Sequence, residues 1–324
     1  MDHVLTAFRR PLVRTGTGRE GLADRGFRSL ARVAALTVLV VLAGIAVSTT
    51  QRAWPAFSSA RLDYFTTSRW DPNVGHYGIL AFVYGTLVTS AIAMVVAVPV
   101  GIGIALFVTE VGSRRVCKVV NLAVDVLAAV PSVVFGLWGF LVLRPRLEEI
   151  FNSVADAVDG VPGLRSVFGP STGSSFMAAG LILGVMIIPI ITSISREVLR
   201  TVPANDRNGA LALGATRWEA IRGVVLPHCT GGLVGAAMLG LGRAMGETIL
   251  VALVIGASPQ IVANLFAQGE AMPSVIARNL NESSGTYQAA LIGLGVVLFL
   301  LTILVNVAAR RTVVVVDRRL KGAR

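Results

Sequence analysis

Six apolar runs, separated by polar or basic segments, dominate the pattern of this chain. A helix rises about 1.5 Å per residue, so about 20 apolar residues cross the hydrocarbon core of a bilayer. The pattern therefore predicts an all-α membrane protein with six transmembrane helices. The predicted spans are approximately 33–50, 79–107, 119–143, 176–195, 230–256 and 287–309.

The polar segments between the runs set the predicted domain organisation. The tail before the first span is rich in arginine and broken by glycine. A second loop, 144–175, carries a predicted amphipathic helix at 147–158, which fits either a docking surface for an external protein or a solvated lid. The predicted divisions are a cytosolic tail 1–32, a first transmembrane helix 33–50, an outer loop 51–78, a transmembrane domain 79–309 that contains an inner loop 200–228, and a cytosolic tail 310–324.

Composition and charge support a membrane protein. Hydrophobic residues make up 54% of the 324 residues and the mean hydropathy is +0.73, above the values of a soluble domain. The net charge is +11, and most of the 29 Lys and Arg fall on segments placed inside when both termini are cytosolic. This is the positive-inside pattern. Without a DNA- or RNA-binding motif, the charge does not indicate a nucleic-acid partner, although the basic tail suits anionic lipid.

The chain lacks the residues of several kinds of chemistry. Cys117 and Cys229 are both placed at the inner face, which argues against a disulfide framework, and the three histidines show no metal-ligand spacing. Neither Lys118 nor Lys321 lies in a phosphate-binding Walker loop. We therefore expect a chain that is not an enzyme, with no catalytic residues, metal or cofactor, and any ATP hydrolysis on a partner chain.

The inner loop 200–228 reads as two short helices. Gly214 supplies the positive φ that ends the first helix. Thr216 and Glu219 form a T-x-x-E capping box that begins the second, and Pro227 is expected to close it. The loop is either an ordinary cytosolic connection or a surface that receives a partner.

Two charged residues lie in the fifth span, 230–256. As one continuous helix, this span would place Arg243 near the bilayer midplane and Glu247 at i+4 on the same face. An intramembrane pair faces a protein seam or a water-filled path. Arg243 would then be a station for a crossing anion, held by Glu247 when empty, or the pair would lock two helices together. Small residues expected on roughly the same face are Gly232, Ala236 and Gly240.

The third span, 119–143, carries two further candidates. Pro131 frees a backbone carbonyl, and Ser132 could satisfy this carbonyl or face the path. Asp125, near the inner end, fits either a contact with the inner loop or an interfacial carboxylate that reaches water.

The inner loop resembles the "EAA" coupling loop of ABC-importer permeases. The resemblance rests on Gly214 and, nine residues later, Val224-Val225-Leu226-Pro227. Where the family has Glu-Ala-Ala before the glycine, this chain has Asn208-Gly209-Ala210. The resemblance implies that the loop sits in a groove on an ATP-hydrolysing subunit. The residues it assigns to this contact are Asn208, Gly209, Ala210, Gly214, Leu226 and Pro227.

The segment 242–248, Gly-Arg-Ala-Met-Gly-Glu-Thr, resembles the R-A-x-G-E-T signature of permeases of the bacterial phosphate-specific importer. The segments 84–88 and 130–139 resemble its C-type subunit, and the likeness extends over roughly 60–310. It implies a type I ABC-importer permease (MetI-like) architecture in a bacterial inner membrane, with Arg243 and Glu247 involved in phosphate movement. The implied partners are a second homologous permease, two ATP-binding subunits and an external phosphate-binding protein.

Three alternatives remain open from the residues. The nearest is a permease for another oxyanion, sulfate or molybdate, with the same architecture. A secondary, ion-coupled transporter could use Glu247 as a proton relay and would work without an ATPase. A structural scaffold would tolerate apolar residues at both Arg243 and Glu247.

Overall fold

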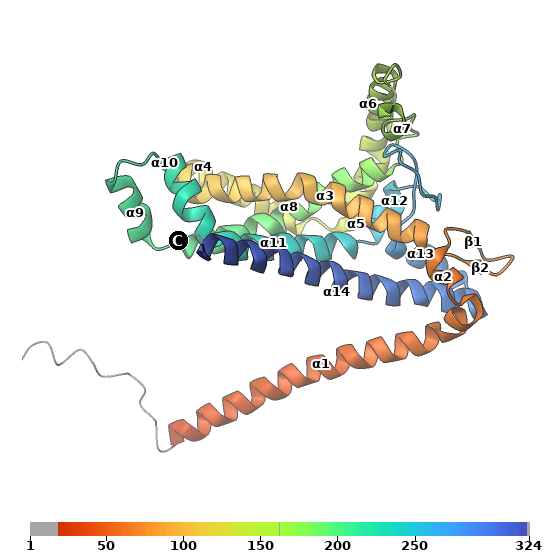
Figure 1. The fold of residues 1–324 in the computed structure, drawn as a ribbon, viewed down its shortest axis with the longest axis horizontal. Coiled ribbons are helices and arrows are strands. Elements are labelled where there is room, and N and C mark those ends of the chain that lie inside the picture. The colour runs from red at the N-terminus through yellow and green to blue at the C-terminus, as the bar shows by residue number, and fades with distance from the viewer. Residues whose placement is uncertain (1–18, 162, 323–324) are drawn as a thin grey trace, which may run out of the picture. The chain divides into compact units, whose positions relative to one another are not determined.

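The computed structural model describes residues 19–161 and 163–322, and it is helical apart from one small hairpin (Figure 1). The chain divides into two compact units, 1–51 and 52–324. The helices up to α8 are α1 (Arg19–Ala60), α2 (Asp63–Thr66), α3 (Leu80–Leu106), the π-helix η1 (Phe107–Val111), α4 (Arg114–Ala129), α5 (Ser132–Trp138), the π-helix η2 (Gly139–Leu143), α6 (Arg144–Ala157), α7 (Leu164–Val167) and α8 (Phe176–Arg200).

The second half of the chain continues the same helical pattern. Its helices are α9 (Ala204–Ala212), α10 (Arg217–Ala220), the π-helix η3 (Ile221–Val225), α11 (Leu226–Met245), α12 (Ile249–Val254), α13 (Met272–Asn279), the 3₁₀ turn η4 (Leu280–Glu282) and α14 (Gly285–Gly322). Strands β1 (Trp70–Asp71) and β2 (His76–Tyr77) pair antiparallel. In the second unit, α9 and α10 lie at one end of the helix bundle, here the loop end, and β1–β2 lie at the other, the hairpin end (Figure 1).

Five helical stretches are long and apolar enough to cross a membrane, and the bent pair α4 with α5–α6 brings the number in the described chain to six. The prediction of an all-α membrane protein is therefore confirmed. The five are Gly26–Ala60, Leu80–Val111, Phe176–Arg200, Arg217–Met245 and Gly285–Ala309. The segment predicted as the third span, 119–143, is broken, because the chain turns by 91° between Ala129 and Ser132. Pro131 has no N–H to continue the helical ladder at this point.

The core of the second unit is built on α8, which packs against α3 and α11. Gly180 lies against Ile92 of α3, and Gly101 of α3 lies against Ile191. Thr192 adds a hydrogen bond from Oγ1 to the Gly101 carbonyl at 3.2 Å. Glycine at these contacts lets the backbones approach closely, so α3 and α8 form one tightly joined pair.

On its other side, α8 packs against α11. Gly232 lies against Val198, and Gly240 lies against Ile191. A separate cluster joins α2 to α14 at the hairpin end, where the buried Tyr64 hydroxyl donates to the Ala290 carbonyl at 2.8 Å. The α3–α8 pair therefore sets the position of α11, which carries the candidate site.

The connection between α8 and α11 has both predicted capping features, but its second helix does not end where the sequence predicted. Gly214 has φ +86°, and the Thr216–Glu219 capping box is present. The prediction that Pro227 closes the second helix is wrong, because α10, η3 and α11 form one helical stretch, Arg217–Met245. Pro227 lies in the first turn of α11, and the π-helical turn before it, 221–225, accommodates the residue that lacks an N–H.

Candidate functional site

The fifth span breaks beside its charged residues. Helix α11 ends at Met245, and α12 begins at Ile249, so the prediction of one continuous helix over 230–256 is wrong. Gly246 is a weak helix former, and Thr248 Oγ1 donates to the Gly246 carbonyl at 3.2 Å. Non-helical backbone at membrane depth is tolerated where it is buried in protein or lines a cavity. The break therefore indicates a position of this span that is buried in protein or lines a cavity.

The predicted ion pair is present at this break. Arg243 Nη2 lies 3.4 Å from Glu247 Oε2, although Glu247 now lies on the tight turn after the helix. The side chain of Arg243 is 53% exposed and that of Glu247 is 4% exposed. A fixed, buried carboxylate therefore faces a guanidinium that keeps most of its donors available, since no other ion pair or hydrogen bond of Arg243 occurs in the described chain.

Arg243 opens into a hollow of about 1040 Å³ between α8, α11 and α14. Among the residues that the structure describes, no carboxylate lines this hollow. Gly232, predicted to lie on roughly the same face as Arg243, lines the hollow together with it. Ala236 and Gly240 are buried, and Gly240 packs on α8. The residues that line the hollow are Ile194, Gly231, Gly232, Val234, Gly235, Met238, Leu239, Gly242, Arg243, Ile303, Asn306 and Val307.

Ser132 and Asp125 are not joined to this site. Ser132 begins α5 and is half-buried, and α5 packs on α12, where Gly136 lies against Leu250. Asp125 is exposed on α4. In the described chain, no hydrogen bond or ion pair links Ser132 to Arg243 or Glu247, or Asp125 to the loop end. A role for Ser132 along a path stays a prediction.

The residues assigned to the coupling loop divide into two groups. Asn208, Gly209 and Gly214 are exposed at the loop end, and Ala210 is half-buried. Leu226 and Pro227 are half-buried where α11 begins. Beside them, the side chains of Leu213 and Trp218 are exposed, with Leu213 at 90%. Large apolar residues exposed together are typical of a surface that receives another protein.

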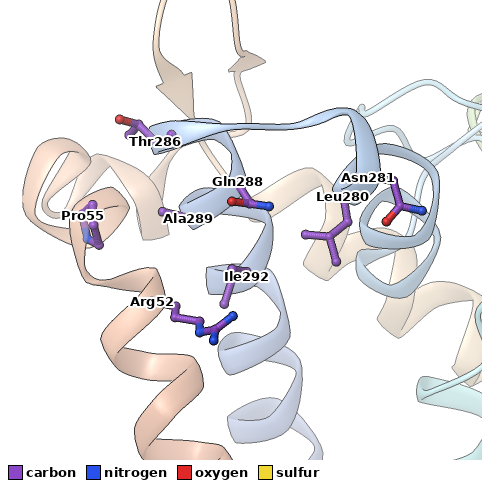
Figure 2. Close-up of a pocket in the computed structure, with 9 residues that line it drawn as sticks. Arg52, Pro55, Leu280, Asn281, Thr286, Gln288, Ala289 and Ile292 are labelled. Atoms are coloured by element: carbon purple, nitrogen blue, oxygen red, sulfur yellow. The ribbon is translucent and has the colours of Figure 1, made fainter.

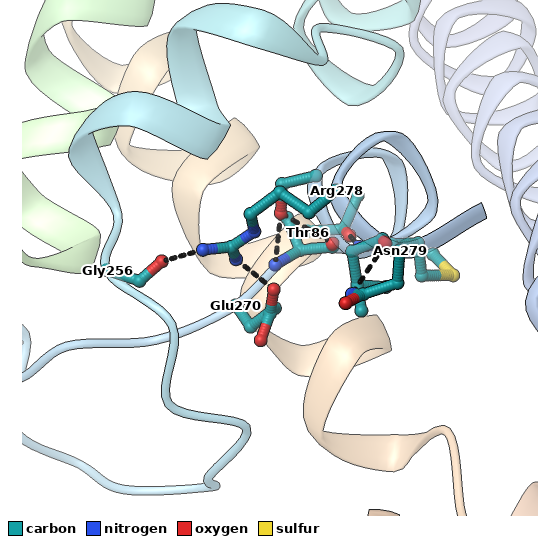
Figure 3. A network of polar contacts seen from close by, with 9 residues as sticks. Thr86, Gly256, Glu270, Arg278 and Asn279 are labelled. Atoms are coloured by element: carbon teal, nitrogen blue, oxygen red, sulfur yellow. Dashed lines mark hydrogen bonds and ion pairs between the residues drawn. The ribbon is translucent and has the colours of Figure 1, made fainter. Parts of the chain in front are cut away.

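A second buried ion pair was missed by the sequence analysis (Figure 3). Arg278 of α13 pairs through Nη2 with the Glu270 carboxylate and donates from Nη1 to the Gly256 carbonyl at 2.9 Å. Next to this pair, the Met272 N–H donates to Thr86 Oγ1 at 3.0 Å. Burial raises the pKa of the Glu270 carboxyl, and the nearby Arg278 guanidinium opposes that change. This network fixes the segment 256–272 to α3.

Another hollow, of about 790 Å³, lies where the end of α1 meets the start of α14 (Figure 2). Its cationic side chain is Arg52, and its lining is otherwise made of small, apolar and amide residues. It shares no residue with the hollow at Arg243. In residues 19–161 and 163–322, no three His, Cys, Asp or Glu are grouped to hold a metal ion.

Comparison with known proteins places this geometry in a family. Residues 97–322 match the model of the binding-protein-dependent transport system inner membrane component. The phosphate transport system permease protein PstC of Mesorhizobium japonicum is 40% identical over 304 residues, 93% of each chain. PstC 2 of Mycobacterium tuberculosis is 40% identical over 296 residues, 89% of this chain and 90% of that protein.

Solved structures show the same fold at low identity. A chain of a bacterial alginate ABC transporter aligns with a TM-score of 0.60 and 16% identity, covering 91% of this chain and 97% of that one. A chain of the MetNI methionine ABC transporter aligns with a TM-score of 0.50 and 19% identity, covering 73% and 94%. The architecture is that of a type I ABC-importer permease, as expected. The chain belongs to the family of binding-protein-dependent transport system inner membrane components.

Proposed function

We propose that this chain is a permease subunit of an ATP-driven phosphate importer in a bacterial inner membrane. The relatives named as phosphate transport permeases support the substrate. The observation that carries the proposal is the half-exposed guanidinium of Arg243, which opens into a large hollow at a break in a membrane span.

When phosphate binds, its oxygens would replace the Glu247 carboxylate as the partner of the Arg243 guanidinium. The planar guanidinium suits the oxygens of phosphate, and a charge-assisted contact is stronger in a site of low dielectric constant than in water. When the site is empty, Glu247 holds Arg243 at 3.4 Å and balances its charge. An arriving anion competes with Glu247 for the exposed donors of Arg243, and the ion pair between Arg243 and Glu247 forms again when the anion leaves. Ser132, which is not joined to the Arg243 site, would line another part of the path.

The assembly comprises a second homologous permease, two ATP-binding subunits and an external phosphate-binding protein. The ATP-binding subunits hydrolyse ATP, and one of them receives the loop 200–228. The exposed Leu213 and Trp218 support this contact. Both termini lie in the cytosol, which agrees with α14 running toward the loop end (Figure 1) and with the positive-inside pattern.

The test is phosphate uptake by the reconstituted complex carrying Arg243→Gln. We expect uptake to be abolished while the ATP-binding subunits still co-purify, because the substitution removes the anion contact and leaves the loop end intact. Arg165→Gln, at an exposed ion pair with Asp159, is the matched control and keeps uptake.

Two results would contradict the proposal. Normal uptake by the Arg243→Gln complex would remove this residue from transport. Purification of the wild-type chain in mild detergent without an ATP-binding subunit would argue against ATP-driven transport. Competition by sulfate and molybdate, compared with phosphate, tests the choice of oxyanion.

A further inference from the structure

Three segments meet around one arginine at the loop end. Arg207 of α9 lies with Nη2 3.0 Å from Glu110 Oε1, in the π-helical end of the span that contains α3. The same nitrogen donates to the Leu199 carbonyl, in the last turn of α8, at 2.6 Å. The Glu110 carboxylate is largely buried, and Arg207 is half-buried. One side chain therefore joins α9 to the ends of two spans.

This contact is the polar attachment of α9 to the bundle. In the described chain, every side-chain hydrogen bond or ion pair between α9 and the spans comes from Arg207. Helix α9 has no buried residue and adds none to the three clusters of buried hydrophobic residues. Without Arg207, α9 keeps its packing against α10 and η3 and its chain connections, at Pro203 on one side and at Gly214, with φ +86°, on the other.

The segments that Arg207 joins lead to the candidate site. Helices α3 and α8 are fastened together through Gly101, Ile191 and Thr192. Helix α8 in turn packs on α11 through Val198 and Gly232, and α11 carries Arg243. A displacement of α9 is therefore passed to the α3–α8 pair and from there to the helix of the site. The loop is also continuous with α11 through the helical stretch Arg217–Met245.

We propose that Arg207, held by Glu110 and the Leu199 carbonyl, is a positioning residue that transmits movement of the coupling loop to the spans α3 and α8. This inference rests on the proposed function. The contacts of Arg207 with Glu110 and with the Leu199 carbonyl attach α9 to the ends of two spans, so the loop 200–228 moves together with them. When these contacts are broken, α9 is no longer fastened to α3 and α8, and ATP hydrolysis moves these two spans less.

The test uses the full complex in proteoliposomes and measures phosphate uptake per ATP hydrolysed. We expect Arg207→Gln and Glu110→Gln each to lower this ratio about tenfold, within the range of coupling energies between sites. ATP hydrolysis and co-purification of the ATP-binding subunits stay close to wild type. The double variant is no worse than either single variant, because both remove the same contact.

The matched control is Arg165→Gln. Arg165 pairs with Asp159 outside the loop 200–228, and both side chains are exposed, so this change leaves the ratio at the wild-type value. Arg207→Lys retains the charge but lacks the forked donors, and we expect a ratio between those of wild type and Arg207→Gln. If Arg207→Gln fails to assemble, the Lys variant carries the test.

A wild-type ratio in Arg207→Gln, or in Arg207→Lys where the Gln variant does not assemble, overturns the inference. Additive losses in the double variant do so as well. Loss of ATP-binding subunits in proportion to uptake would show a docking role instead and would also overturn it. The proposed function fails separately, if the wild-type complex shows no ATP-driven phosphate uptake.

Discussion

The pairs Glu247–Arg243 and Glu270–Arg278 contrast two uses of a buried carboxylate. The two carboxylates are similarly buried, at 4% and 7% exposed. Arg278 is 31% exposed and binds both Glu270 and the Gly256 carbonyl, whereas Arg243 is 53% exposed and makes one contact at 3.4 Å. The Glu270–Arg278 pair, here the closed pair, uses its donors within the protein and holds a segment in place. The Glu247–Arg243 pair, here the open pair, leaves a cation available to a visiting anion.

The largest expected effect on stability concerns the closed pair. Arg278→Met leaves the Glu270 carboxylate buried and unpaired, and we expect the unfolding free energy to fall by about 3–5 kcal/mol. Adding Glu270→Gln removes the unpaired charge and recovers most of this loss. Reversible unfolding in detergent, measured by denaturant titration of the four members of the double-mutant cycle, gives the coupling energy of the pair.

The open pair supplies the matched control for that cycle. Arg243→Met with Glu247→Gln should give a smaller coupling energy than the Arg278–Glu270 cycle, because the Arg243 contact is single and long and Arg243 is half-exposed. Equal coupling energies in the two cycles would remove the distinction between a structural clamp and an available cation.

A smaller effect concerns the pH dependence of the closed pair. Because the pKa of the Glu270 carboxyl is raised in the folded state, its contribution to stability is complete below the usual glutamate pKa of about 4.3 and is lost as the pH rises through the raised pKa. Glu270→Gln cannot ionise, so this part of the pH dependence disappears. We expect a difference of about 1 kcal/mol, since Arg278 offsets much of the cost of burial.

The measurement is thermal unfolding of wild type and Glu270→Gln from acid to neutral pH. An unchanged pH profile in the variant would show that Glu270 does not titrate in this range.

Local signals in the sequence predicted much of the site. The cap at Thr216 and the positive φ at Gly214 follow from rules that act within a few residues, and both are present. The Arg243–Glu247 pair was also predictable, because a spacing of four brings side chains together in a helix and, here, in the turn that follows it. The six apolar runs identified the membrane class by length and composition alone.

The break after Met245 and the continuity through Pro227 were not predictable in the same way. Gly246 and Pro227 are each compatible with a helix or with its end, and the neighbouring packing decides between the two. The pairs Glu270–Arg278 and Glu110–Arg207 are formed across loops and between spans. Each of these residues looks in isolation like an ordinary polar residue between apolar runs, so only the tertiary structure brings the partners together.

The most direct test compares phosphate uptake by two complexes, one carrying Arg243→Gln and the other carrying Arg278→Gln with Glu270→Gln, at equal amounts of assembled complex. The account predicts that uptake is lost in the first and retained in the second, because Arg243 offers free donors to the anion whereas Arg278 is occupied by Glu270 and the Gly256 carbonyl. Retained uptake in the first complex, or loss in both, would contradict the account.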